Sequence, residues 1–206
     1  SVRTYDREAN AIRTFAAADC GFAYRSSRFK AMPDRHVILS VMFQFALGDR
    51  SVPVAYTELA RTLDIAVGHR APSTDVRDAV LDLRRGKGMV LDADDHDTWS
   101  AGSFFTNPMM SATQAAALPE GAPRFDQPDG TVKTSAAWLI DHAGFSKGYG
   151  TGPVTLSTKH ALALTNRGGA KTADLLALAR EVRSGVEAKF GVTLVNEPVL
   201  VGCTLS

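Results

Sequence analysis

The densest group of residues whose types could do chemistry is the run Ser100-Ala101-Gly102-Ser103-Phe104-Phe105-Thr106-Asn107-Pro108. Gly102 lets the backbone turn sharply and lets a ligand approach it. Ser103 places a hydroxyl beside that turn, and Asn107 adds an amide donor and acceptor. Short Gly-Ser segments are also common in ordinary turns, so the residue types alone favour a plain turn with two buried rings.

Two further segments combine residue types that bind anions or move protons. Tyr24 and Arg25 open the run Tyr24–Lys30, and an arginine flanked by a tyrosine and hydroxyls suits a carboxylate or a phosphate. A solvated basic face is the alternative that residue types alone favour. Glu197 lies between two predicted strands, where a carboxylate is either buried and functional or exposed at a strand corner. Spacing leaves both interpretations open.

Two basic residues are weaker candidates for a functional role. Lys87 lies between two glycines that expose its ammonium group, although it also suits a plain cation at a helix end. His160 precedes a predicted strand, where a surface histidine or a satisfied core histidine is commoner than a catalyst. The chain has no GxGxxG after a strand, no GxxxxGK[ST] and no HExxH, so no Rossmann, P-loop or metal site is predicted.

Composition limits the class of protein. The chain has 206 residues, of which 45% are hydrophobic and 22% charged, with a net charge of +1. These values are typical of a soluble globular protein, with no sign of a nucleic-acid or membrane surface. No apolar run reaches the ~18 residues that a membrane span needs. Because Cys20 and Cys203 lie far apart, we expect free thiols and a cytoplasmic location. The chain opens with Ser1 and reads like a strand entered midway, so we expect a missing N-terminal portion.

The elements that must position these residues follow from hydrophobic periodicity. Strands are predicted at residues 1–5, 37–45, 161–165, 192–195 and 199–201, with 37–45 buried because it is apolar throughout. Helices are predicted at residues 73–86, 135–142 and 172–190, with Thr172 as a cap and Gly191 as the end of the last. Residues 119–130 read as a surface loop. Strands and helices mix without a regular βαβ rhythm, which predicts an α+β fold.

Five segments together resemble the UDP-N-acetylenolpyruvoylglucosamine reductases, the MurB family. They are Tyr24–Lys30, Ala101–Pro108, Ala136–Asp141, His160–Asn166 and Asn196–Gly202. Each is weak alone, whereas all five in this order and at these separations are specific, and the likeness covers nearly the whole chain. In addition, Val54–Leu59 resembles the tyrosine-bearing loop of the type I enzymes, and the sequence looks actinobacterial.

The resemblance implies a fold and a domain plan. Residues 1–87 would be the second half of a vanillyl-alcohol-oxidase-type FAD-binding domain. Residues 88–193 would form the MurB substrate-binding domain, and 194–206 would return to the FAD-binding region. The family's Gly-rich flavin-pyrophosphate segments precede everything present here. We therefore expect the 206-residue chain alone neither to hold FAD tightly nor to turn over, and we expect a monomer.

The resemblance also implies a reaction in peptidoglycan precursor synthesis. NADPH reduces FAD, and a hydride then reaches the enolpyruvyl double bond of UDP-N-acetylglucosamine enolpyruvate, giving UDP-N-acetylmuramate. Arg25 and Glu197 match the family residues that stabilise the enolate-like charge, and Ser103 matches the serine that donates the proton. Tyr24, Arg25 and Gly102 would contact FAD.

Five more residues match substrate-binding positions of the family: Tyr56, Lys87, Asn107, Lys147 and His160. Two departures stand out. Many relatives have a lysine where Thr106 stands, and many end in Glu-Pro-Glu-Val where this chain has Asn196-Glu197-Pro198-Val199.

Two other classes of protein compete with the reductase. One is a flavin-free nucleotide-sugar binding module with the same fold, but a mere binder needs no proton donor such as Ser103. The other is a different flavoenzyme that shares the FAD domain, such as an oxidase. It leaves the Gly-Ser-Phe-Phe segment and the Tyr56 loop unexplained.

Overall fold

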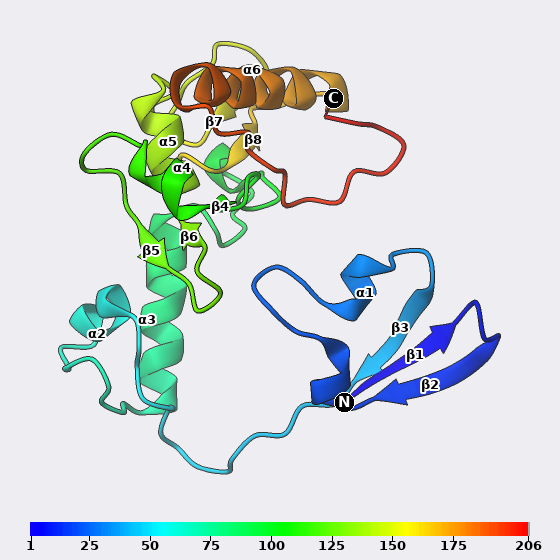
Figure 1. Cartoon of the computed structure of the whole chain (residues 1–206). Helices are drawn as coiled ribbons and strands as arrows, with labels where there is room; N and C mark the ends of the chain where they lie inside the picture. The colour runs from blue at the N-terminus through cyan, green and yellow to red at the C-terminus, as the bar shows by residue number, and fades with distance from the viewer. Residues whose placement is uncertain (206) are drawn as a thin grey trace. The chain divides into compact units, whose positions relative to one another are not determined.

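The computed structural model describes residues 1–205, which form two compact units (Figure 1). The first unit comprises Ser1–Asp49 and the second begins at Arg50. The domains expected at residues 1–87, 88–193 and 194–206 stay a prediction.

The first unit is a small antiparallel sheet in the order β2-β1-β3, drawn in blue in Figure 1. Its elements are β1 (Val2–Asp6), β2 (Ala11–Phe15), η1 (Ala17–Cys20), α1 (Arg28–Ala31) and β3 (His36–Val41). The central strand β1 alternates along its length, burying Val2, Thr4 and Asp6 on one face. This alternation is expected of a strand with one covered face.

A buried carboxylate organises the end of this sheet. Both oxygens of Asp6 accept hydrogen bonds from Arg35, at 3.1 Å from Nε and 3.0 Å from a terminal nitrogen. The Asp6 carboxylate also accepts the backbone N–H groups of Glu8 and Ala9. The hydrogen bond from Arg35 is the main cause that lowers the pKa of Asp6 to about 2.

The strand predicted at residues 37–45 exists only in part, and the prediction of its burial was wrong. β3 ends at Val41, and its residues after His36 are exposed. Ile38 is 51% exposed and Phe45, beyond the strand, is 80% exposed. An apolar run predicts burial only if another layer covers it, and within the first unit no layer buries this one.

The second unit contains most of the helices. They are α2 (Thr57–Thr62), α3 (Ser73–Gly86), η2 (His96–Thr98), α4 (Ala112–Ala116), α5 (Ala136–His142) and α6 (Thr172–Phe190). Its strands are β4 (Met109–Met110), β5 (Phe125–Asp126), β6 (Val132–Lys133), β7 (Val154–Leu156) and β8 (Leu164–Asn166). They form a β4-β6-β5 sheet and a β7-β8 hairpin. The mixture confirms the α+β class.

The long helix α6 contributes several buried side chains to the core of this unit. Ala179, Val182 and Val186 lie on the predicted stripe and are completely buried. The helix ends at Gly191, which adopts the predicted left-handed conformation with φ of 64°. The predicted cap was one residue late, since the N-cap is Lys171 and Thr172 begins the helix.

Two helix predictions agree with the structure, whereas three strand predictions do not. The helices predicted at residues 73–86 and 135–142 are α3 and α5. The strand predicted at 161–165 begins only at Leu164, because residues 161 and 162 form a turn. Residues 192–195 and 199–201 form no strand in the described chain. Pro198 lacks an N–H group and interrupts any ladder there.

Within residues 1–205, no helix combines the length and the apolar character that crossing a bilayer requires.

Candidate functional site

The segment around Ser103 runs between two others that are distant in sequence. On one side, the Phe104 N–H donates to the Leu162 carbonyl at 2.7 Å, and Ser103 pairs with Ala163. On the other side, the Phe104 carbonyl accepts the N–H of Glu197 at 2.8 Å. These backbone bonds bring Ser103 and Glu197, two of the predicted catalytic residues, onto neighbouring segments.

Local sequence explains the turn that presents Ser103. Gly102 has φ of 83°, a conformation that favours glycine, and its N–H donates to the Ser100 hydroxyl at 3.2 Å. Phe104 and Phe105 are buried with their rings edge to face at 5.0 Å, as the sequence predicts. The rings anchor the segment in the core, while Ser103 stays half-buried at its edge.

The hydroxyl of Ser103 has a histidine as its neighbour. His160 Nε2 lies 3.3 Å from Ser103 Oγ, within hydrogen-bonding distance. The His160 backbone N–H donates to Ser157 Oγ at 3.2 Å, and its carbonyl accepts the Ala163 N–H at 3.0 Å. Burial lowers the pKa of His160, and the charges of Lys87 and Lys147 lower it further.

Asp97 holds the turn that carries His160. Its carboxylate accepts the Thr158 N–H at 2.9 Å, the Thr158 hydroxyl, and the Arg167 guanidinium at 2.7 Å. Burial by itself would raise the pKa of Asp97, but the bonds from Thr158 and Arg167 outweigh it and lower the pKa to about 2. Beside this group, Lys159 pairs with Asp95.

A pocket of about 540 Å³ opens beside His160, and we call it the lysine pocket. It is lined by Lys87, Ala137, Trp138, Asp141, His142, Ser146, Lys147, Lys159, His160 and Ala161. Three lysines against one aspartate make it an attractive site for an anion. Three of the five predicted substrate-binding residues, Lys87, Lys147 and His160, therefore line one pocket.

Lys87 already has an ion-pair partner, which lies outside the lining of this pocket. Its ammonium group lies 2.6 Å from a carboxylate oxygen of Glu58, which belongs to α2. The hydrogen bond from Lys87 lowers the pKa of Glu58. Lys147 is exposed and has no ion-pair partner within residues 1–205. An incoming anion would therefore meet Lys147 directly and would compete with Glu58 for Lys87.

The other two predicted substrate-binding residues lie outside the lining of this pocket. The Asn107 side-chain oxygen accepts the Ala136 N–H at 3.0 Å, which caps the start of α5. Tyr56 precedes α2 and is 78% exposed. The Asn107 side chain thus caps α5, whereas the exposed Tyr56 side chain is accessible to a ligand.

Tyr24 and Arg25 belong to the first unit. They form the tip of a two-residue turn closed by reciprocal backbone bonds of 3.1 Å between Ala23 and Ser26. Arg25 adopts a left-handed φ of 54°, and its guanidinium lies 5.6 Å from the centre of the Tyr24 ring. Both side chains are exposed.

Sequence reasoning missed Lys159, Trp138 and His142 as lining residues of the lysine pocket. The rings of Trp138 and His142 stack with their centres 3.8 Å apart. Their four-residue separation on one helix was the signal for this contact, because residues i and i+4 share a face. Lys159 adjoins His160, and only the fold shows that both face one space.

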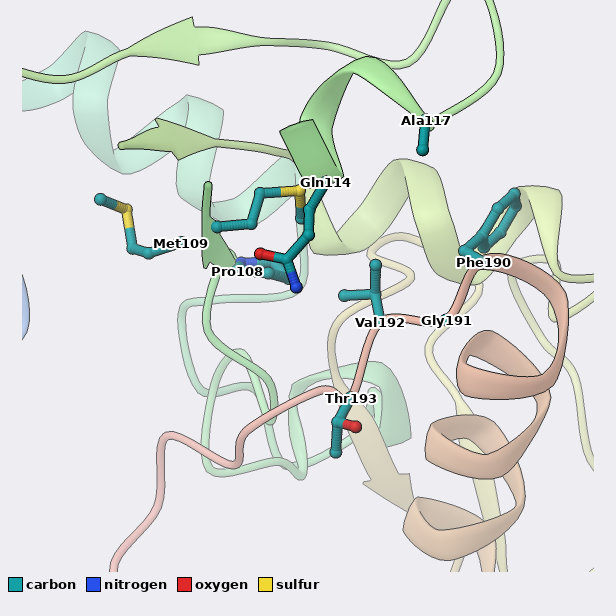
Figure 2. Close-up of a pocket in the computed structure, with 9 residues that line it drawn as sticks. Pro108, Met109, Gln114, Ala117, Phe190, Gly191, Val192 and Thr193 are labelled. Atoms are coloured by element: carbon teal, nitrogen blue, oxygen red, sulfur yellow. The ribbon is translucent and has the colours of Figure 1, made fainter. Parts of the chain in front are cut away.

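A second pocket, of about 350 Å³, lies between β4, α4 and the segment after α6, as Figure 2 shows. Its lining is Pro108, Met109, Met110, Gln114, Ala117, Phe190, Gly191, Val192 and Thr193. None of these side chains is ionisable, and none was predicted to act on a substrate. The lysine pocket is therefore the better candidate for an anionic ligand.

A protein-family model matches the part of the chain that holds the candidate site. The model described as UDP-N-acetylenolpyruvoylglucosamine reductase, C-terminal domain, matches residues 94–201. The match includes Ser103, His160 and Glu197.

Curated relatives carry the same description. A UDP-N-acetylenolpyruvoylglucosamine reductase of Cutibacterium acnes is 60% identical over 99% of this chain and 54% of its own length. One of Thermobifida fusca is 58% identical over 99% of this chain and 60% of its own length. The chain thus spans somewhat more than half the length of these relatives.

Among solved structures, a UDP-N-acetylenolpyruvylglucosamine reductase (MurB) from Thermus caldophilus matches 94% of this chain and 50% of its own chain. The identity is 19% and the TM-score 0.49.

Proposed function

This chain belongs to the family of UDP-N-acetylenolpyruvoylglucosamine reductase C-terminal domains, and on that premise we propose that it is part of such a reductase. The whole enzyme would use NADPH and FAD to reduce UDP-N-acetylglucosamine enolpyruvate to UDP-N-acetylmuramate for peptidoglycan precursors. In this proposal the chain is the C-terminal part of a cytoplasmic monomer. Residues 1–87 complete a vanillyl-alcohol-oxidase-type FAD domain, residues 88–193 bind substrate, and the remainder returns to the FAD domain.

One observation carries the proposal. The Phe104 carbonyl accepts the Glu197 backbone N–H at 2.8 Å, and Ser103 Oγ lies 3.3 Å from His160 Nε2, so the segment around Ser103 adjoins the segments that carry Glu197 and His160. The lysine pocket adjoins them through His160. A proton donor next to an anion site is what reduction of a nucleotide-sugar enol ether requires.

The proposed chemistry assigns a role to each of three residues. Hydride addition to the terminal carbon of the enolpyruvyl group pushes charge into its carboxylate. Arg25 and Glu197 stabilise that charge, with Glu197 acting as a hydrogen-bond partner. Ser103 gives its proton to the adjacent carbon. A serine hydroxyl is a poor acid in water, so it must lie within about 3 Å of that carbon and be assisted electrostatically.

The lysine pocket suits the diphosphate of the substrate. Lys147 and Lys87 offer ammonium groups, and Trp138 adds an aromatic ring to the lining. Asn107 and Tyr56 would contact the sugar and nucleotide from outside the pocket lining. Glu58 would have to yield Lys87 as the diphosphate arrives, because a fully paired cation binds an anion weakly.

FAD is the cofactor this reaction needs, and the residues present fit part of it. A Cβ built on Gly102 would meet no atom within 4 Å, so the backbone there is open to a ligand. The exposed turn of Tyr24 and Arg25 offers a ring and a guanidinium. Each of these three residues would contact the flavin, which supplies the hydride when bound.

Two measurements test this function. Calorimetric titration of the 206-residue chain should detect UDP binding, which weakens in Lys147→Gln and is unchanged in Lys30→Gln, a cation outside the pocket. In the whole reductase, NADPH oxidation without oxygen should depend on the enolpyruvyl sugar.

Other outcomes identify the competing classes. UDP-sugar binding without NADPH oxidation would indicate a flavin-free binding module. NADPH oxidation driven by oxygen alone would indicate an oxidase. Either result contradicts the proposal.

A further inference from the structure

His160 and Ser103 meet through their side chains although 57 positions separate them in the chain. Backbone contacts link the two residues, and a further hydrogen bond fixes the backbone of His160. Ser103 pairs with Ala163 through the backbone, and the Ala163 N–H donates to the His160 carbonyl at 3.0 Å. The Ser157 hydroxyl accepts the His160 backbone N–H at 3.2 Å, which fixes the backbone that carries the imidazole. The backbone of this turn thus places His160 Nε2 next to Ser103 Oγ.

We propose that His160 is a positioning residue that acts through Ser103, holding its hydroxyl and returning to it the proton that Ser103 gives to the substrate. The inference rests on the proposed function, because it takes Ser103 as the proton donor. In the step, the Oγ–H bond of Ser103 breaks while a C–H bond forms on the substrate. The Nε2–H bond of protonated His160 then breaks, the Oγ–H bond forms again, and His160 is left neutral until solvent reprotonates it.

A partner of this kind answers a chemical need. A serine that has lost its proton is a strong base, and it must regain a proton before the next turnover. A side chain in contact with Ser103 can return that proton directly. His160 touches Ser103 and also lines the lysine pocket, so it can pass a proton from the pocket to Ser103.

Titratable groups from several elements line the lysine pocket together with His160. They are Lys87 at the end of α3, Asp141 and His142 on α5, Lys147 after α5, and the adjacent Lys159. Burial first, then Lys87 and Lys147, lower the pKa of His160, so without a ligand it is mostly neutral at pH 7. A diphosphate would cancel these two positive charges and raise the pKa. Binding of a diphosphate in the pocket would therefore favour the protonated form of His160.

The first test uses proton NMR of the 206-residue chain, with His160→Gln and His142→Gln spectra to assign the two imidazoles. UDP should raise the pKa of His160 by about half a unit or more, because it neutralises neighbouring cations. Inorganic diphosphate should do the same, and the exposed His69 should not respond. If UDP binds and the His160 titration does not move, the inference is wrong. If UDP does not bind at all, both the inference and the proposed function fail.

The second test follows reoxidation of the reduced whole reductase by the enolpyruvyl sugar between pH 5 and 8. His160→Ala removes both the hydrogen bond and the proton and should slow this step about tenfold or more. His160→Gln keeps a donor for Ser103 but cannot titrate, so its rate should be intermediate and independent of pH. His69→Gln is the matched control and should behave as wild type.

The outcomes separate the two ideas. A wild-type reductase that never reduces the sugar overturns the proposed function and the His160 role with it. A wild-type reductase that does so, alongside a His160→Gln enzyme with the wild-type rate and pH profile, overturns the His160 role alone. Equal slowing in both variants with an unchanged pH profile would reduce His160 to a packing residue, which also contradicts the inference.

Discussion

The two units of this chain differ in how far they bury similar apolar side chains. In the second unit, Val182 on α6 and Ile140 on α5 are completely buried in a shared core. In the first, Ile38 on β3 is 51% exposed. The difference lies in the layers. Helices α5 and α6 bury apolar stripes against each other, whereas β3 is an edge strand of a single sheet.

The same contrast extends to the candidate site. Ser103 and His160 are fixed by backbone bonds and by the buried Asp97 group, so their geometry is preorganised within the second unit. Arg25 and Tyr24 lie at an exposed turn tip of the first. One unit therefore holds its candidate residues within a hydrogen-bonded segment, and the other presents them at an exposed turn. Substitutions in each unit test that difference, from the largest expected effect to the smallest.

Ser103→Ala should have the largest effect, because it removes the proposed proton donor from the preorganised site. In the whole reductase, sugar-dependent reoxidation should slow by about 100-fold to 10,000-fold, the usual range for a lost acid. Stopped-flow absorbance of the flavin measures this step. Ser184→Ala, on the exposed face of α6, is the control. If the Ser103 variant were reoxidised at the wild-type rate, Ser103 would not be the proton donor.

Ile140→Ala and Ile38→Ala compare the two units directly. The first deletes a completely buried side chain and should lower the free energy of unfolding of the second unit by about 2–5 kcal/mol. The second deletes a half-exposed side chain and should cost less than about 1 kcal/mol in the first unit. Hydrogen exchange read by mass spectrometry resolves the two units. Equal costs would break the comparison.

Asp97→Asn tests the buried ion pair that supports His160. Losing charged hydrogen bonds should lower the free energy of unfolding by about 2 kcal/mol at pH 7. Because the folded pKa of Asp97 is lowered to about 2, its contribution is complete above the ordinary value near 3.8 and disappears as pH falls through about 2. Urea unfolding between pH 2 and 7 should show the two proteins converging at low pH.

The matched variant is Asp6→Asn, which lies in the first unit. It should speed hydrogen exchange in β1 and leave residues 157–160 unchanged. Faster exchange at residues 157–160 in the Asp6 variant would contradict this prediction.

Gly185→Ala tests the tight packing of α6. A Cβ at this position would lie 2.4 Å from the Phe145 ring, so the ring must move. The clash should outweigh the roughly 1 kcal/mol that alanine adds to a helix interior and leave a net loss of about 1–2 kcal/mol. Thermal unfolding measures it. Gly152→Ala, where a Cβ would meet nothing within 4 Å, is the control. A stabilised Gly185 variant would mean that this interface is loose.

Glu58→Gln should have the smallest effect, and in the opposite direction. It frees Lys87 from an exposed ion pair, so UDP should bind about two- to fivefold more tightly, and less so at high salt. Calorimetric titration at low and high salt measures the change. Glu120→Gln, an exposed carboxylate far along the chain from α2, is the control. Weaker binding by the Glu58 variant would give Glu58 a direct role in holding the ligand.

Local patterns in the sequence were enough for several features. The stripe of α6, its Gly191 end, the helix at α5 and the turn at Gly102 depend on residues within a few positions of one another. The order of five motifs was enough for the family, because the matched domain contains most of them. These features were predicted because nearby residues cause them.

Only the tertiary structure decided which distant segments meet. The backbone bond between Phe104 and Glu197 and the contact of Ser103 with His160 join positions that no periodicity relates. The predicted burial of residues 37–45 was wrong for the same reason, since Ile38 is exposed and burial depends on the layer opposite a strand. A sequence states which groups a segment offers to its neighbours. The neighbours themselves are chosen by packing, which sums many weak contacts over the whole unit.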